Sequence, residues 1–138
     1  MQDVQIKLVA KHSLYGQTEK TVTVYQGKGA EKVSAWYITY KEHIEGAGDV
    51  TTTLKVSEKE VTLLRQGGLQ MKQQFEKGMS SHSPYVSPHG RFTMETHTRK
   101  LLVTSKQTRP QEIRIEYQLW MNEQYVGEHE LTIHLDWT

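Results

Sequence analysis

Apolar and polar residues alternate along almost the whole chain, from Val4 to Trp137, and this pattern constrains the fold more than any other feature of the sequence. Successive side chains of a β-strand point to opposite faces, so a period of two predicts strands with one buried and one solvated face. Gly, Pro and Asn separate the alternating segments and predict turns between them. Hardly any segment favours a helix, so the sequence predicts a closed or nearly closed antiparallel β structure in one domain, residues 1–138.

The composition excludes several kinds of function. Seventeen basic and sixteen acidic residues leave a formal charge of +1, so no long-range attraction draws nucleic acid or an anionic membrane to the chain. The absence of cysteine excludes a disulfide framework, a thiolate nucleophile and a cysteine-ligated zinc site. No apolar run resembles a signal peptide or a transmembrane segment, and we expect a cytoplasmic protein.

One segment is compatible with two structures. Ser57-Glu58-Lys59-Glu60 has the spacing of a helix capping box, which allows a helix over residues 58–66 that ends at Gly67. The same residues also alternate as strands, with Val61 and Arg65 on one face. We predict strands, because the flanking segments are β and an isolated short helix gains little without packing.

The register of the next hairpin decides where Arg65 points. A two-residue turn at Gly67-Gly68 sends Arg65 to the outer face. A three-residue loop, Gln66-Gly67-Gly68 with Gly68 in a left-handed bulge, pairs Arg65 with Leu69. A slip of one residue turns every side chain of the strand to the other face. The three-residue loop predicts an inward Arg65, and burial favours it because it gathers the apolar residues on one face: Val61, Leu63, Leu69, Met71 and Phe75.

Other segments predict loops and solvated hairpin tips. Gly27-Lys28-Gly29 predicts a flexible loop. Glu42, Glu45 and Asp49 cluster after a strand, and we expect them at a solvated hairpin tip. Asn122-Glu123 lies between two strong strands and predicts a tight hairpin, although Gly is preferred at its second position.

Three stretches carry a resemblance to a known family. They are Leu54-Lys55-Val56-Ser57 continued by Val61-Thr62-Leu63-Leu64-Arg65-Gln66-Gly67, Tyr85-Val86-Ser87-Pro88-His89-Gly90-Arg91-Phe92, and Ile115-Glu116-Tyr117-Gln118-Leu119-Trp120-Met121-Asn122. Together they resemble the YwiB-like proteins, small bacterial β-barrels of unknown function grouped with the calycins, the lipocalin-like superfamily. The resemblance spans most of the chain. It implies an all-β, up-and-down antiparallel barrel of roughly eight to ten strands, and it implies no activity.

Arg65 is the residue of greatest functional interest. An inward guanidinium must be paired, solvated or bound to an anion, because an unpaired buried charge is costly. Its planar fork suits a ligand carboxylate or phosphate. Alternatively, Arg65 is structural and bonds to Glu, Asp or backbone carbonyls at the end of the barrel, which is the commoner role of buried charges. Gln73 on the same face fits either role.

Aromatic side chains provide either a cavity lining or a core: Trp36, Tyr40, Phe75, Phe92 and Tyr117. Small barrels fill themselves with side chains or hold one small ligand, and aromatic stripes more often belong to cores. The hydroxyls of Tyr40 and Tyr117 need partners if they are buried. They are therefore candidate orienting groups in a mostly apolar pocket.

No motif predicts catalysis, a metal or a cofactor. His129 and His134 lie five residues apart, on opposite faces of one strand, so they cannot jointly bind a metal ion. Serines lie near His82 and His89, but no nucleophile elbow is present. We therefore expect no catalytic residue, no metal ligand and no cofactor site.

The sequence favours a binding protein over an enzyme. We expect a small apolar or amphipathic ligand whose acidic group meets Arg65, with further contacts from Gln73, Tyr40, Tyr117, Trp36 and Phe75. The alternative is a filled barrel that contacts a protein or RNA and binds no small ligand. A third hypothesis is an enzyme with Tyr, His or Glu at the barrel mouth. An internal cavity that reaches Arg65 favours the first function, and an interior packed with side chains favours the second.

Overall fold

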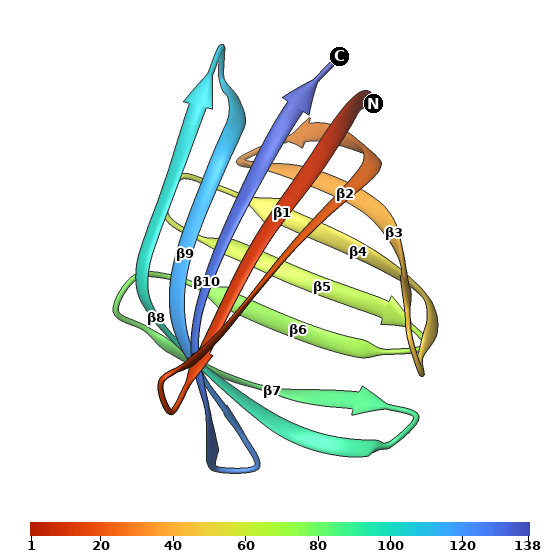
Figure 1. Cartoon of the computed structure of the whole chain (residues 1–138). Helices are drawn as coiled ribbons and strands as arrows, with labels where there is room; N and C mark the ends of the chain where they lie inside the picture. The colour runs from red at the N-terminus through yellow and green to blue at the C-terminus, as the bar shows by residue number, and fades with distance from the viewer.

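The computed structural model describes residues 1–138 and consists of strands and turns (Figure 1). No helix long and apolar enough to cross a membrane is present. The segment that allowed a helix contains none, and a strand begins there at Val61, as predicted. The ten strands are β1 (Gln2–Leu14), β2 (Gln17–Lys32), β3 (Ala35–Ile44), β4 (Gly48–Val56), β5 (Val61–Gly67), β6 (Gln70–Phe75), β7 (Ser80–Ser87), β8 (Gly90–Lys106), β9 (Arg109–Met121) and β10 (Gln124–Trp137).

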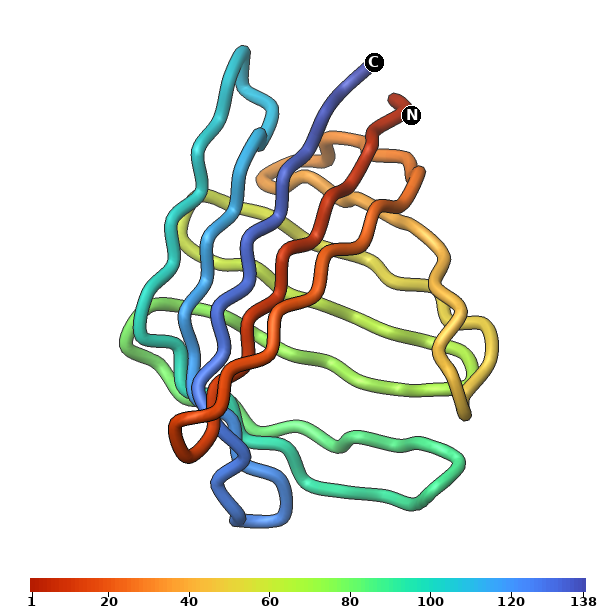
Figure 2. The backbone as a smooth tube through the Cα atoms, viewed as in Figure 1, coloured from red at the N-terminus to blue at the C-terminus, as the bar shows by residue number.

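The strands close into one antiparallel barrel. Each strand pairs with its neighbours in sequence, and β1 pairs with β10 to complete the ring in the order β1-β10-β9-β8-β7-β6-β5-β4-β3-β2. The two ends of the chain therefore lie side by side, with Val4 paired to Trp137 (Figures 1 and 2). The predicted up-and-down antiparallel barrel is confirmed.

Tight hairpins join several strands. Asn122 and Glu123 have φ of 49° and 67°, and Tyr15 and Gly16 have φ of 49° and 80°. Two successive positive φ values define the type I′ turn, whose twist matches that of paired strands. The predicted Asn122-Glu123 hairpin is confirmed, and Figure 2 shows these two hairpin loops projecting from the same end of the barrel.

The prediction of a flexible loop at Gly27-Lys28-Gly29 is wrong. Both glycines lie inside β2, which continues to Lys32. A Cβ on Gly27 would lie 2.5 Å from the Thr39 carbonyl oxygen, and a Cβ on Gly29 would lie 2.4 Å from the Trp137 ring. The glycines therefore allow neighbouring backbone and aromatic groups to approach the strand closely.

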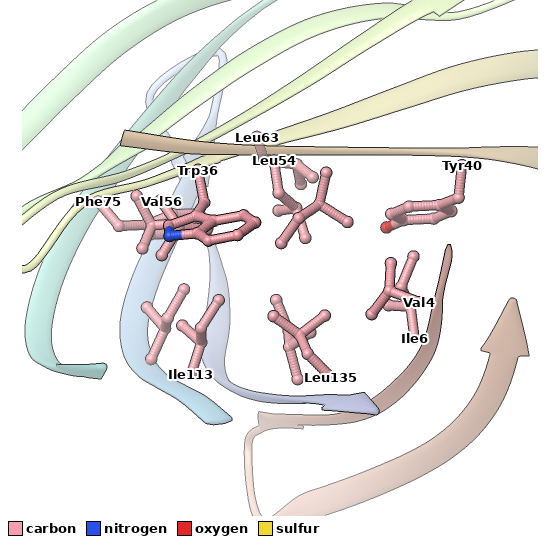
Figure 3. Close-up of a cluster of buried hydrophobic side chains, with 14 of the residues drawn as sticks. Val4, Ile6, Trp36, Tyr40, Leu54, Val56, Leu63, Phe75, Ile113 and Leu135 are labelled. Atoms are coloured by element: carbon pink, nitrogen blue, oxygen red, sulfur yellow. The ribbon is translucent and has the colours of Figure 1, made fainter. Parts of the chain in front are cut away.

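The interior of the barrel is filled by a cluster of 16 buried hydrophobic residues, most of them drawn in Figure 3. Two tryptophans pack at one end of this cluster. The rings of Trp36 and Trp137 lie 5.0 Å apart. Their Nε1–H groups donate to the carbonyls of Thr108 (3.0 Å) and Pro110 (2.8 Å). Trp36, Tyr40 and Phe75 are thus core residues.

The β5–β6 hairpin keeps the predicted facing of Arg65 but not the predicted pairing. Arg65 pairs with Met71 rather than with Leu69, and the loop covers residues 67–69. The positive φ, 131°, falls on Gly67 rather than on Gly68. Gly67 still pairs with Val50 of β4, and Leu69 is buried, which together move the loop one residue onward. The displacement changes the pairing by two residues, so Arg65 remains on the inner face.

The barrel closes unevenly, because only two residue pairs join β6 to β7: Gln70 with Val86, and Met71 with Tyr85. Pro84 follows in the ladder and has no N–H to donate. The hydroxyl of Ser83 donates to the Lys72 carbonyl instead, and that of Ser81 donates to the Gln74 carbonyl at 3.2 Å. We refer to this weakly paired line between β6 and β7 as the seam.

Candidate functional site

Arg65 points into the barrel and pairs with Glu42 of β3. Its Nη2 donates to Oε1 of Glu42 at 3.4 Å. Its buried Nε lies 3.1 Å from Oε2, within ion-pair distance but not aligned for a hydrogen bond. The same Oε2 accepts a hydrogen bond from the Thr52 hydroxyl at 3.1 Å. The Glu42 side chain is 3% exposed and that of Arg65 is 25% exposed, so the carboxylate depends on the guanidinium for its neutralisation.

The prediction that Glu42 lies at a solvated hairpin tip is therefore wrong. β3 continues to Ile44, and the turn follows it at residues 45–47. Glu42 continues the inward series of Ile38 and Tyr40, so the alternation of β3 carried the signal for its burial. Glu45 and Asp49 are exposed, as predicted.

Tyr40 lies beside this pair. Its ring stacks on Tyr25, with centroids 4.9 Å apart. Burial raises the pKa of Tyr40 well above its ordinary range, the Glu42 carboxylate raises it further, and the Arg65 guanidinium opposes both effects. The hydroxyl therefore stays neutral throughout the physiological range and cannot act as a base there.

Gln73, Tyr117 and Phe75 form a second group of predicted site residues. Gln73 is buried and donates to the Thr96 hydroxyl at 3.0 Å. The rings of Phe75 and Tyr117 pack against each other, with centroids 4.9 Å apart. Burial raises the pKa of Tyr117 to about 12, whereas Arg65 and Gln73 lower it. This group is therefore held together by contacts within the protein.

The six predicted residues do not surround one cavity. Figure 3 shows Trp36 and Phe75 at one end of the core and Tyr40 at the other. The polar partners of Arg65 and Gln73 are supplied within the protein, by Glu42 and Thr96. The structure thus brings Arg65 and Tyr40 together through Glu42. It places Trp36 at the opposite end of the core, where Trp36 packs against Trp137.

Sequence reasoning missed a stack of three rings. His12 and His129 lie 4.5 Å apart, and His129 and Tyr117 lie 5.0 Å apart. The His12 Nε2–H donates to the Val126 carbonyl at 2.7 Å. Burial lowers the pKa of His129 to about 4, His12 lowers it further, and Glu128 raises it. Only the pairing of β1 with β10 brings these histidines together, so no local pattern could have revealed the stack. No group of three potential ligands is placed to hold a metal ion.

A groove lies on the outside of the barrel, over the seam. It has a volume of about 380 Å³, and its lining includes the basic residues Lys72 and Arg91. Arg65 also borders it, although the Arg65 guanidinium points into the barrel towards Glu42. Its other lining residues are apolar or amide side chains, with no carboxylate among them: Leu64, Gln66, Gln70, Met71, Pro84 and Val86. Neither Lys72 nor Arg91 lies within ion-pair distance of a carboxylate. We call this site the seam groove.

Another hollow, which Trp36 helps to line, differs in charge. It has a volume of about 430 Å³, and its lining includes Glu31 and Glu58 but no basic residue. An anionic ligand would be repelled there. Of these two sites, only the seam groove has the charge that the sequence predicted for a ligand site.

Fold and site together define a class of protein: an all-β, closed antiparallel barrel with a filled interior and a basic groove over its weakest seam. Within that class, the chain belongs to the family described as a domain of unknown function (DUF1934), whose model matches residues 6–133.

The comparisons with individual proteins agree with this assignment. The chain is 30% identical over 97 residues to the uncharacterized beta-barrel protein YwiB of Bacillus subtilis (strain 168), covering 70% of this chain and 67% of that protein. It also matches the crystal structure of the YwiB protein from Bacillus subtilis, with a TM-score of 0.78 at 23% identity. That match covers 96% of this chain and 91% of the other. The resemblance seen in the sequence is confirmed, and so is the barrel fold.

Proposed function

We propose that this protein binds an amphipathic anion, carrying a carboxylate or phosphate, in the seam groove rather than inside the barrel. The observation that carries the proposal is the pair of basic side chains Lys72 and Arg91 beside apolar surface, with no acidic residue in the lining of the groove. The filled interior argues against the ligand position first expected from the sequence. The only support from the fold is an analogy: lipocalins are up-and-down barrels that bind small ligands, although they hold them inside the barrel.

The groove has the composition of a small-molecule site. Its volume of about 380 Å³ lies within the usual range for such sites. Its apolar contacts and orienting amides come from Leu64, Met71, Pro84, Val86, Gln66 and Gln70. The cations differ in role: Glu42 neutralises part of Arg65, whereas Lys72 and Arg91 have no such partner and are free to bind an anion.

A titration with defined probes tests the proposal. Dodecanoate and dodecyl phosphate supply the anion and the apolar chain, and dodecanol supplies the chain alone. Isothermal titration calorimetry below the micelle concentration should show binding of both anions and at least about tenfold weaker binding of dodecanol.

The matched variants reverse charges inside and outside the groove. Lys72→Glu with Arg91→Glu should weaken both anions by at least about tenfold, whereas Lys59→Glu on the exposed β4–β5 loop should leave them unchanged. Arg65 is left intact, because its loss would also leave the Glu42 carboxylate without its counter-charge. Anion binding that is insensitive to the Lys72 and Arg91 reversals would place the ligand elsewhere.

A second candidate function is favoured by the filled interior: a macromolecular interaction module in the cytoplasm that holds no small ligand. In that case the wild-type protein binds none of the three probes. Catalysis has less support, because the titratable groups nearest Arg65 are either paired, as Glu42 is, or fixed in the neutral state, as Tyr40 is.

A further inference from the structure

The outer edge of β2 is unpaired over most of its length. β2 pairs with β1 through thirteen residue pairs, from Gln2 with Gly29 to Leu14 with Gln17, without a register shift. On its other side it pairs with β3 only from Gly27 to Lys32. Residues 17–26 therefore have a neighbour on one side alone, and residues 17–24 are exposed without exception. In Figure 1, β3 turns away from β2 at this point.

The hairpin turn determines which backbone groups of this edge face solvent. The two-residue type I′ loop makes Leu14 and Gln17 a hydrogen-bonded pair, and the pairs alternate from there along the antiparallel ladder. Odd-numbered residues of β2 thus bond to β1. The N–H and C=O groups of the even-numbered residues point outward: Thr18, Lys20, Val22, Val24 and Gln26. Lys28, the next in this series, faces β3 and pairs with Thr39, as the alternation requires.

This edge lacks most of the features that keep natural edges from pairing. Proteins protect exposed edges with proline, bulges, several charges or very short strands. Residues 17–26 contain no proline and no bulge, and Lys20 is their one basic residue. Val22 and Val24 are 55% and 51% exposed, and they are β-branched residues that favour strand pairing.

We propose that β2 pairs with β2 of a second copy of this chain, antiparallel about a two-fold axis at Val22. This register places Val22 opposite Val22 and Lys20 opposite Val24, and it forms about ten backbone hydrogen bonds between outward-facing groups. The interaction surface is separate from the seam groove and does not depend on the proposed function.

The charges of the edge suit a second copy. Glu19 and Lys20 both lie on the same side of Val22, so a two-fold pairing sets Glu19 opposite Tyr25 and Lys20 opposite Val24. No like charges face each other directly, and the exposed valines gain apolar cover. A single strand pair buries little surface compared with a permanent interface, so we expect a concentration-dependent dimer.

The test measures self-association from about 5 to 500 µM by sedimentation velocity, a range that spans weak and moderate dimers. The wild-type chain should pass from monomer to dimer. Val22→Pro removes an outward N–H that β1 does not use, so the monomer should fold as before. Two bonds at the axis are lost, and dimerisation should weaken by about 30-fold. Val22→Thr keeps the N–H and should still dimerise.

Amide exchange provides a readout that does not depend on variants. In the dimer the amides of Lys20, Val22 and Val24 should become protected at high concentration, while those of Thr21 and Thr23 are protected at every concentration. A wild-type chain that stays monomeric across the concentration range would overturn the proposal. The unpaired edge of β2 would then be a binding site for an extended segment of another protein. A dimer with unprotected even-numbered amides, or one that a folded Val22→Pro variant forms as tightly as the wild-type chain, would equally overturn it.

Discussion

Removal of Arg65 should destabilise this protein far more than removal of its partner Glu42. The Glu42 side chain is 3% exposed, so without the guanidinium its carboxylate keeps only the hydrogen bond from Thr52, 3.1 Å away. An uncompensated buried charge costs about 3–5 kcal/mol. Arg65 is 25% exposed, so after Glu42→Gln the guanidinium can still be solvated, and the loss should be about 1–2 kcal/mol.

Equilibrium unfolding in urea at pH 7 measures these differences, with tryptophan fluorescence as the signal. The double variant Glu42→Gln with Arg65→Ala should be more stable than Arg65→Ala alone, because the neutral amide leaves no charge behind and can still accept a hydrogen bond from Thr52. The coupling free energy between the two sites should therefore be at least about 2 kcal/mol. A loss below about 1 kcal/mol for Arg65→Ala, or a larger loss for Glu42→Gln, would refute the argument that the guanidinium neutralises a buried carboxylate.

Two further predictions concern stability. The folded His129 has a pKa of about 4 and the unfolded one about 6.5, so the unfolded chain binds a proton first and stability should fall as the pH drops from 6.5 towards 4. After allowance for partial exposure this amounts to about 1–2 kcal/mol, and urea titrations at several pH values should show a shallower fall in His129→Phe. Gly29→Ala should cost about 1–3 kcal/mol, because its Cβ would lie 2.4 Å from the Trp137 ring, and a change in tryptophan fluorescence should accompany the lowered melting temperature.

Alternation predicted much of this fold, because the buried apolar residues of a strand show whether its odd-numbered or its even-numbered residues face the interior. It placed Arg65 on the inner face even though its pairing partner was wrong by two residues, since a shift of two preserves the face. The same rule applied to β3 would have placed Glu42 inside with Tyr40. The grouping of Glu42 with Glu45 and Asp49 suggested a solvated hairpin tip and obscured that signal.

The remaining errors came from contacts between strands far apart in the chain. Gly27 and Gly29 fit a loop by composition, and only the approach of Thr39 and Trp137 explains them as strand residues. The seam groove likewise joins Lys72 of β6 to Arg91 of β8, which no local spacing connects. The sequence therefore predicted that Arg65 faces inward, but it did not predict the position of the groove.

The two-pair seam also implies where the barrel yields first. The next shortest ladder, between β5 and β6, has five pairs, so parting β6 from β7 breaks the fewest backbone bonds. Local opening is cheapest where such bonds are few. A molecule that binds both Lys72, on one side of the seam, and Arg91, on the other, would link the strands on the two sides. Binding would then stabilise the closed barrel against separation of β6 from β7.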